Sequence, residues 1–350
     1  MDIFLYFILL FALFFLCTRL GSISSNYKLP PISYQATLLI GVIVVFKLGT
    51  FPIIEYDDKS NYSRTFENLT LLNIWDVKDI GFAFYSLAIK ILVDNSAIYF
   101  IVTAFIYVLG YFIFARSLFN KLHLSYFLLA CFFSFGFASY GVNIIRGGLA
   151  LSFLLMSFSF YKKTKWYVLF SITAILCHKS MLLPFLGFYV TRFYNNTKFY
   201  FYFWTFCLVV SLLNINLITS FVGGIIGDTD ERFLGYLTEK AKGRYNAGFR
   251  IDFLIYSIIP ILVGWYYIVK LKIKDVFYLK MFNTYLVSNA IWLLVIRMAF
   301  TDRMAYLSWF ILPFILLYPH LKYELHVNQK KWVFIILLGI FSFTTFMYFK

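Results

Sequence analysis

Charged side chains are scarce in this chain. Asp, Glu, Lys and Arg make up 13% of its 350 residues, whereas a soluble domain carries roughly 25%. Hydrophobic residues make up 62%, and the mean hydropathy is +0.80. No long polar segment that could fold as a separate soluble domain interrupts the apolar runs. The composition therefore predicts a polytopic membrane protein with a single transmembrane domain over residues 1–350.

Cysteine and histidine are also few, and neither forms a recognisable motif. The four cysteines, Cys17, Cys131, Cys177 and Cys207, lie in apolar runs without a CxxC pair, which argues against a disulfide framework or a zinc site. The four histidines are scattered, and the sequence contains no Walker, GxSxG or Rossmann motif. We expect neither a metal ion nor a bound cofactor.

The formal charge of +15 does not indicate a nucleic-acid partner, because it is spread over short loops and forms no basic domain. The loops at residues 19–28, 116–121, 162–165, 192–198, 270–280 and 322–331 have a net charge of +14. The rest of the chain has a net charge of +1. The positive-inside rule places these positively charged loops in the cytoplasm. The chain termini and the polar loops 52–94 and 223–250 are then external.

Membrane-length apolar runs predict an all-α fold of about 11 transmembrane helices, at roughly 20 residues each. The clearest runs are Ile3–Cys17, Ile32–Phe51, Ala97–Ala115, Tyr126–Ile144, Gly148–Tyr161, Phe199–Val222, Ile251–Val269, Val276–Ile296, Met304–Tyr318 and Trp332–Phe349. The pattern of Gly81–Val93 suits a helix lying in the membrane interface. Trp166–Val190 is either one interrupted span or a re-entrant hairpin. Cytoplasmic loops on both sides favour the hairpin, with His178 near its outer tip.

Arg146 opens an apolar helix and is followed by Gly147 and Gly148. A charge at this depth is costly and usually functional, although an arginine at a helix end can also extend to water. Glycines permit close backbone approach, and a helix N-terminus offers N–H donors to an anion. These features predict a corner that binds a diphosphate.

His178 and Lys179 interrupt the apolar segment that follows. A lone histidine in such a segment is often a satisfied core residue. Here the neighbouring lysine would lower the histidine pKa and favour the neutral form, which can accept a proton. A catalytic role, a role in positioning the substrate and a structural role all remain open for His178.

Three more arginines, Arg250, Arg297 and Arg303, lie at membrane boundaries on the same predicted side as Arg146. Local pairing with Asp252 or Asp302 would explain them structurally. The planar guanidinium also matches phosphate oxygens, and a lipid diphosphate carries its charge at that depth.

Four segments in order resemble the EpsG family, which groups with Wzy-type polysaccharide polymerases. They are Lys78-Asp79-Ile80-Gly81-Phe82, Asn143-Ile144-Ile145-Arg146 with Leu149-Ala150, Cys177-His178-Lys179-Ser180 before Pro184, and Arg303 with Tyr306. The resemblance spans roughly residues 35 to 320. The family often has Gln after the arginine, where this chain has Gly147, so a Gln–substrate hydrogen bond is not carried over.

The resemblance implies a GT-C-like, metal-independent glycosyltransferase in the bacterial inner membrane. It would polymerise undecaprenyl-diphosphate-linked repeat units into O-antigen or a similar polysaccharide at the periplasmic face. Arg146 and Arg303 would hold the diphosphate, and His178 would lie beside the acceptor hydroxyl. Further candidate substrate contacts are Asn143, Gly147, Lys179, Arg250, Arg297 and Tyr306. The expected partners are the lipid-linked donor and acceptor, membrane lipid and a chain-length regulator protein.

Two other functions remain as alternatives. A flippase for the lipid-linked glycan would need a charged central cavity, whereas the notable cations gather at one predicted face. An acyltransferase would favour a histidine facing the cytoplasm, but His123, His320 and His326 lie in ordinary loops. The polar loop Gly223–Arg250 is either a glycan-binding lid or a solvated connector.

Overall fold

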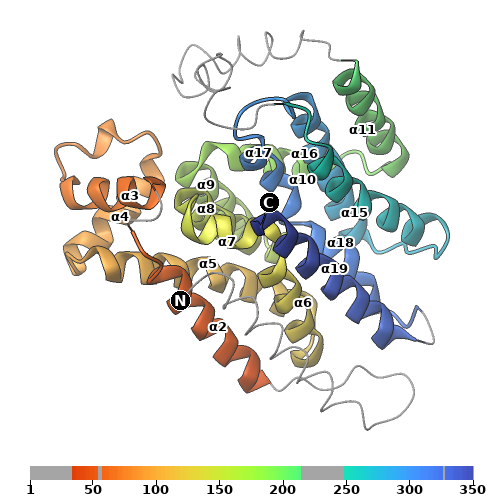
Figure 1. Ribbon diagram of the computed structural model, residues 1–350, viewed down its shortest axis with the longest axis horizontal. Helices are drawn as coiled ribbons and strands as arrows, with labels where there is room; N and C mark the ends of the chain where they lie inside the picture. The colour runs from red at the N-terminus through yellow and green to blue at the C-terminus, as the bar shows by residue number, and fades with distance from the viewer. Residues whose placement is uncertain (1–33, 54–56, 214–247, 326–327, 350) are drawn as a thin grey trace. The chain divides into compact units, whose positions relative to one another are not determined.

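The computed structural model describes residues 34–53, 57–213, 248–325 and 328–349, and all regular secondary structure in these ranges is helical (Figure 1). The all-α prediction is confirmed for them. The chain forms two compact units, residues 1–182 with 320–350 and residues 183–319, and each is described by itself. The expected single domain stays a prediction. The expected span Ile3–Cys17 lies outside the described residues, as does all but the end of the loop Gly223–Arg250.

The described residues of the first unit form eleven helices. They are α2 (Tyr34–Gly49), α3 (Asp57–Asn68), η1 (Ile74–Asp76), α4 (Ile80–Leu92), α5 (Ser96–Leu118), α6 (Lys121–Phe133), α7 (Phe135–Val142), α8 (Ile145–Ser159), α9 (Thr164–Cys177) and η2 (Lys179–Met181), to which the C-terminal α19 (Gln329–Phe349) is added. The helices of the second unit are α10 (Leu182–Val190), α11 (Thr197–Leu212), α15 (Ile251–Val269), α16 (Val276–Leu294), α17 (Thr301–Trp309) and α18 (Leu312–Lys322), of which α10 and α18 cross its boundaries.

Several of these helices suit a polytopic membrane protein. Within the described ranges, four are long and apolar enough to cross a membrane, or five if a bent pair counts as one span, and six more are shorter and apolar. The expected total of about 11 spans and the GT-C-like fold stay predictions. Trp166–Val190 is interrupted at His178, as expected. The return of this segment to its starting side stays a prediction, because its two halves belong to different units.

The expected span Tyr126–Ile144 is not one continuous helix. The chain bends by 71° between α6 and α7, and Ser134 at the bend has an extended backbone. Its hydroxyl donates to the Cys131 carbonyl at 2.7 Å, a local bond that competes with helix continuation. Thr344 of α19 donates to the Phe133 carbonyl at 2.7 Å. The bend persists because side chains replace backbone bonds that an apolar environment would leave unmade.

The segment 52–94 is more ordered than the polar loop expected from its composition. Asp57 and Asp58, which the sequence analysis placed in that loop, begin α3. A buried cluster of Leu69, Ile74, Ala83 and Leu87 joins the elements that follow. The expected helix at Gly81–Val93 is present as α4, and its location in the membrane interface stays a prediction.

Two lysines hold this segment to its neighbours through carbonyls at helix ends. Lys59 of α3 is fully buried and donates to the carbonyls of Leu48, Gly49 and Phe51 at 3.3, 3.1 and 2.6 Å. Lys90 of α4 donates to two carbonyls at the end of α3. A cation suits a helix C-terminus, where carbonyls lack intrahelical donors. Lys59 thus anchors α3 to the end of α2.

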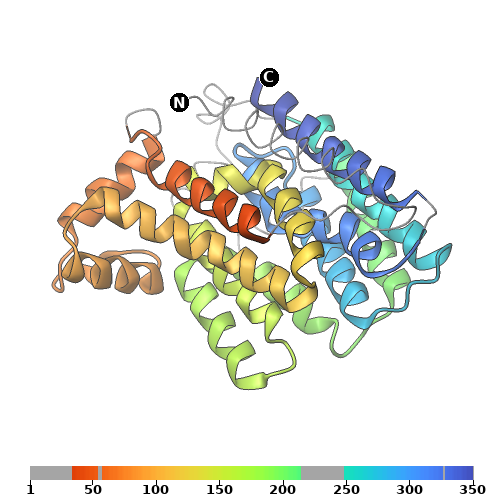
Figure 2. The ribbon, with the colours of Figure 1, turned by 90° about the horizontal axis from the view of Figure 1, so that it is seen from below.

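Small side chains allow the long helices of the first unit to pack closely. A Cβ atom on Gly110 of α5 would lie 2.5 Å from the Ser152 Cα of α8. The hydroxyls of Ser157 in α8 and Ser171 in α9 are 2.6 Å apart. Figure 2 shows α2 lying along α5. Such contacts between small residues are typical of helices in membranes, and here they fix the positions of α8 and α9.

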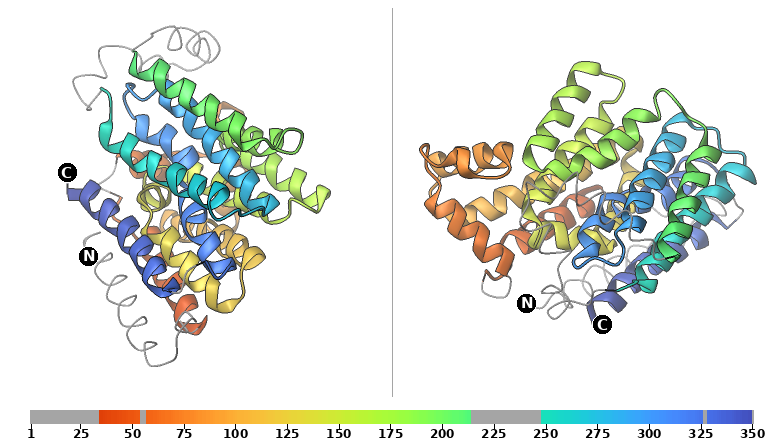
Figure 3. Two further views of the ribbon diagram at one scale, coloured as in Figure 1. Left: turned by 90° about the vertical axis from the view of Figure 1, so that its right-hand side faces the viewer. Right: turned by 90° about the horizontal axis from the view of Figure 1, so that it is seen from above.

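The second unit is held together by hydrogen bonds between buried polar side chains. The Trp204 indole of α11 donates to Asn289 of α16 at 2.8 Å, and Asn289 donates to Ser308 of α17 at 3.1 Å. The Trp309 indole donates to Ser257 of α15 at 2.8 Å. Figure 3 shows α11, α15 and α16 side by side. These bonds satisfy polar groups that would otherwise be unpaired in an apolar core.

Replacing Lys59 tests the anchoring of the outer segment. In Lys59→Met the carbonyls of Leu48, Gly49 and Phe51 lose their shared donor. We expect the free energy of unfolding to fall by about 1–3 kcal/mol, because buried acceptors are left unsatisfied. Thermal unfolding in detergent measures this. Arg64→Met is the matched control, because Arg64 is exposed on the same helix. Equal effects of the two substitutions would contradict the anchoring role.

Candidate functional site

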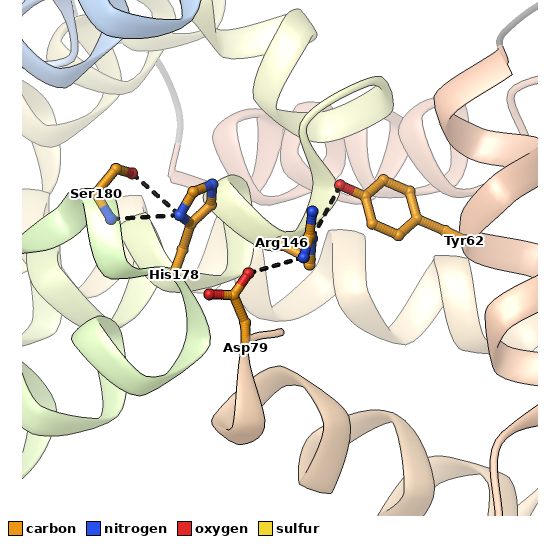
Figure 4. A network of polar contacts seen from close by, with 5 residues as sticks. All are labelled: Tyr62, Asp79, Arg146, His178 and Ser180. Atoms are coloured by element: carbon orange, nitrogen blue, oxygen red, sulfur yellow. Dashed lines mark hydrogen bonds and ion pairs between the residues drawn. The ribbon is translucent and has the colours of Figure 1, made fainter. Parts of the chain in front are cut away.

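Three helix ends meet in the first unit, and each carries a motif residue of the sequence analysis (Figure 4). Asp79 precedes α4, Arg146 lies in the first turn of α8, and His178 follows α9. These residues are far apart in the sequence. We define them, together with Tyr62 of α3, as the helix-end site.

The guanidinium of Arg146 forms an ion pair with a carboxylate. Its Nη1 lies 2.8 Å from Asp79 Oδ2, with the side chains 20% and 4% exposed. Its Nε donates to the Tyr62 hydroxyl at 3.4 Å, and its Cζ is 5.7 Å from the Tyr62 ring centre. Asp79 and Tyr62 approach from opposite sides (Figure 4). Arg146 is therefore held by partners from two other segments of the first unit.

Gly81 explains how Asp79 comes to lie here. A Cβ atom at Gly81 would be 2.8 Å from the Leu176 carbonyl carbon and 3.0 Å from the Cys177 backbone nitrogen. The first turn of α4 thus contacts the last turn of α9 directly, with no side chain between them. Only glycine permits this approach, and the approach places Asp79 and His178 on adjacent helix ends.

Gly147 and Gly148 also make a close approach, but it is to Tyr140 of α7. A Cβ atom at Gly148 would lie 2.4 Å from the Tyr140 carbonyl oxygen, and one at Gly147 would lie 2.8 Å from the Tyr140 ring. The Gly148 N–H donates to the Ile144 carbonyl at 2.8 Å. The glycines therefore fix the start of α8 against α7. Contact between Gly147 and substrate stays a prediction.

Asn143 lies just before Arg146, at the end of α7. Its Oδ1 is buried and has no hydrogen-bond partner among the described residues. A buried amide oxygen without a donor is costly, so this position can accept a hydrogen bond from a ligand hydroxyl or a water molecule. The arrangement is compatible with the expected substrate contact.

His178 is half-buried, and its Nδ1 faces Ser180. The Ser180 backbone N–H donates to Nδ1 at 3.4 Å, and the Ser180 hydroxyl lies 3.1 Å away. A backbone amide can only donate, so Nδ1 carries a lone pair and the neutral ring carries its proton on Nε2. This tautomer can donate to a substrate oxygen. The role of His178 stays a prediction. Lys179 is exposed at the start of η2.

The other three arginines belong to the second unit and differ in their partners. Arg250 forms two hydrogen bonds with Asp252, at 3.0 and 2.7 Å. This local pairing is one of the two alternatives that the sequence left open. In it, the Asp252 carboxylate balances the positive charge of Arg250. Arg297 is exposed, and its Cζ lies 4.9 Å from the ring centre of Phe249. The two arginines therefore differ in the charge they can offer an anion.

The guanidinium of Arg303 lies over the ring of Phe300, a residue with a strained backbone conformation. Its Cζ is 4.8 Å from the Phe300 ring centre. Phe300 has a φ of 56°, a left-handed conformation that bulky residues rarely adopt and that often marks functional sites. Tyr306 is 2% exposed and packs edge-on against Trp309, with ring centres 5.7 Å apart. The contact of Tyr306 with substrate stays a prediction.

Sequence reasoning missed Asp79 and Tyr62 as members of the site. Asp79 was noted only as part of a family motif, and Tyr62 was assigned to a polar loop. Asp79 could have been identified as a candidate partner of Arg146, because a buried arginine requires a counter-charge. Tyr62 gave no signal, because its contact depends on the folding of α3.

Gly81→Ala tests the contact between α4 and α9. The added methyl overlaps backbone atoms of Leu176 and Cys177, so no side-chain rotation can relieve it. We expect the free energy of unfolding to fall by about 1–3 kcal/mol, measured by thermal unfolding in detergent. Gly339→Ala is the matched control, since a Cβ there meets no atom within 4 Å. Unchanged stability of Gly81→Ala would show that the helix ends do not touch.

One of three comparisons with known proteins found a match. The family model described as EpsG family matches residues 37–350 of the 350. No curated protein and no solved structure matches the chain. The matched range includes the whole helix-end site and the arginines of the second unit. EpsG is a Wzy-like polymerase family, which indicates a membrane glycosyltransferase of the polysaccharide-polymerase kind. The chain belongs to the EpsG family.

Proposed function

We propose that this protein polymerises undecaprenyl-diphosphate-linked oligosaccharide repeat units into O-antigen or a similar surface polysaccharide. The reaction takes place at the periplasmic face of a bacterial inner membrane. Family membership and the apolar helices support this function. The observation that carries it is the helix-end site, where Arg146, Asp79 and His178 from three separate motifs lie together.

The reaction exchanges one bond at an anomeric carbon. The growing chain is the donor, and its first sugar is attached to a lipid diphosphate. A hydroxyl of the incoming repeat unit forms a new bond to this carbon as the bond to the diphosphate oxygen breaks. The diphosphate leaves with the electron pair, so the main demand on the protein is to stabilise negative charge that develops there.

Arginines meet this demand without a metal ion. Asp79 and Tyr62 engage Nη1 and Nε of Arg146, so Nη2 can donate to a diphosphate oxygen. The Phe300 ring supports the guanidinium of Arg303 from one face, which reduces the freedom lost when it binds phosphate. Arg297 supplies a further exposed charge. Arg250 contributes less, because Asp252 already matches its charge.

His178 positions the acceptor. In the tautomer set by Ser180, its Nε2–H can donate to an oxygen of the incoming sugar. Asn143 Oδ1 accepts a hydrogen bond from a sugar hydroxyl, and Lys179 lies in the exposed turn beside the histidine. The remaining expected partners are membrane lipid, which surrounds the helices, and a regulator protein that sets chain length.

Substitution of Arg303 tests the polymerase function in cells. We expect Arg303→Ala to slow transfer about 10²–10³-fold, since one preorganised donor to the developing charge is lost. Arg303→Lys should restore little, because an ammonium lacks the planar fork. Polysaccharide gels of normally expressed variants should show single repeat units without a ladder. Arg116→Ala, at an exposed helix end, should keep the ladder. Loss of the single repeat unit as well would indicate a flippase instead.

Chelation tests the absence of a metal requirement. Purified protein supplied with a lipid-diphosphate-linked repeat unit should extend it at an unchanged rate in excess EDTA, because guanidinium groups stabilise the leaving diphosphate. Mass spectrometry of the products measures the rate. Activity that is lost in EDTA and restored by added Mg²⁺ or Mn²⁺ would contradict the mechanism.

A further inference from the structure

We propose that Asp79 is the catalytic base that takes the proton from the acceptor hydroxyl. The inference rests on the proposed function and adds a residue to its chemistry. From sequence His178 is a candidate for this step, but Asp79 lies beside it in the structure (Figure 4).

The ring of His178 is poorly placed to accept a proton. Its Nδ1 lone pair already accepts a hydrogen bond from the Ser180 amide, and the Ser180 hydroxyl lies 3.1 Å from the same atom. The remaining nitrogen of the neutral ring carries the proton, so it offers a donor to the substrate. The acceptor hydroxyl therefore needs another group for its own proton.

The carboxylate of Asp79 does not cap the helix that it precedes. It stands immediately before α4, where an aspartate ordinarily accepts hydrogen bonds from the first-turn amides. Here the side chain makes no such bond, and its Oδ2 is directed to Arg146 at 2.8 Å. Among the described residues, none hydrogen-bonds to Oδ1. The carboxylate reaches Arg146 from the side on which His178 lies (Figure 4).

Burial suits this carboxylate to the task. Asp79 is 4% exposed, so bulk water competes little with a bound hydroxyl. The guanidinium of Arg146 supplies the counter-charge that allows an anion to persist at this position. In the resting site Arg146 and Asp79 together carry no net charge, which limits how strongly the pair attracts the diphosphate before reaction.

Proton transfer to Asp79 changes this balance during the reaction. The acceptor O–H bond breaks and its proton goes to Oδ1, while the oxygen bonds to the anomeric carbon. The bond from that carbon to the diphosphate breaks, and its electrons leave with the diphosphate. Neutralising Asp79 leaves Arg146 with an unmatched positive charge as the diphosphate gains negative charge. The pair thereby binds the transition state more strongly than the ground state.

An acceptor that needs no base separates this role from a structural one. Azide ion is a nucleophile without a proton to lose, so transfer of the glycan from the lipid-diphosphate donor to azide bypasses Asp79. We expect Asp79→Ala to lose transfer to the sugar hydroxyl about 10²–10⁴-fold and to keep transfer to azide at or above the wild-type rate. Mass spectrometry distinguishes the glycosyl azide from the extended glycan.

Controls make each outcome decisive. Arg303→Ala should lose transfer to both acceptors, because it acts on the donor. Asp79→Asn keeps the shape of the side chain and replaces Asp79→Ala if that variant does not fold. Loss of both transfers in a folded Asp79 variant, or full polymerisation by it, would overturn the base role alone. If wild-type protein transfers no glycan from the lipid-diphosphate donor to either acceptor, the proposed function fails and the base role fails with it.

Discussion

The need to match the charge of Arg146 inside the protein is the constraint on which the rest of the site depends. A guanidinium that is 20% exposed in a largely apolar chain must find a counter-charge, because an unpaired buried charge is strongly destabilising. Asp79 supplies it from a segment that lies 67 positions away in the sequence. The ion pair therefore dictates where the segment before α4 must lie.

Neighbouring features serve the same requirement. Gly81 lets α4 approach α9 closely enough for its preceding carboxylate to reach the site, and Gly148 seats the start of α8 against Tyr140. Lys59 and Lys90 tie α3 to the helices on either side of it, which brings Tyr62 against Arg146. What composition presents as a polar external loop is a folded helical segment, and it completes the site.

Much of the helical content could be predicted from sequence, because apolar runs of membrane length have few alternatives to helix. The bend at Ser134 could not be predicted, since it involves Thr344, a distant residue whose hydroxyl donates to the buried Phe133 carbonyl. The order in segment 57–76 was also missed, because its stability comes from one buried lysine and a small apolar cluster. Local composition does not reveal either long-range contact.

A site residue could be predicted where an ionisable side chain stands in an apolar segment, because such a placement is energetically costly. Arg146 and His178 interrupt apolar segments, so their importance was visible, whereas Asp79 resembled the other acids of a polar segment. The contacts of the arginines differ: Arg250 forms an ion pair with Asp252, and the guanidinium of Arg303 lies over the ring of Phe300. Sequence places all four arginines near membrane boundaries but does not show that Arg146 pairs with Asp79 and Arg250 with Asp252.

A double-mutant cycle on unfolding tests the central constraint most directly. Asp79→Asn and Arg146→Gln each remove one charge and leave the other buried without its partner, so each should lower the free energy of unfolding by about 3–5 kcal/mol. The double variant contains neither charge, and its loss should be smaller than the sum of the single losses by about 1–3 kcal/mol. Losses that add to within about 0.5 kcal/mol would show that the two residues do not depend on each other and would contradict the account.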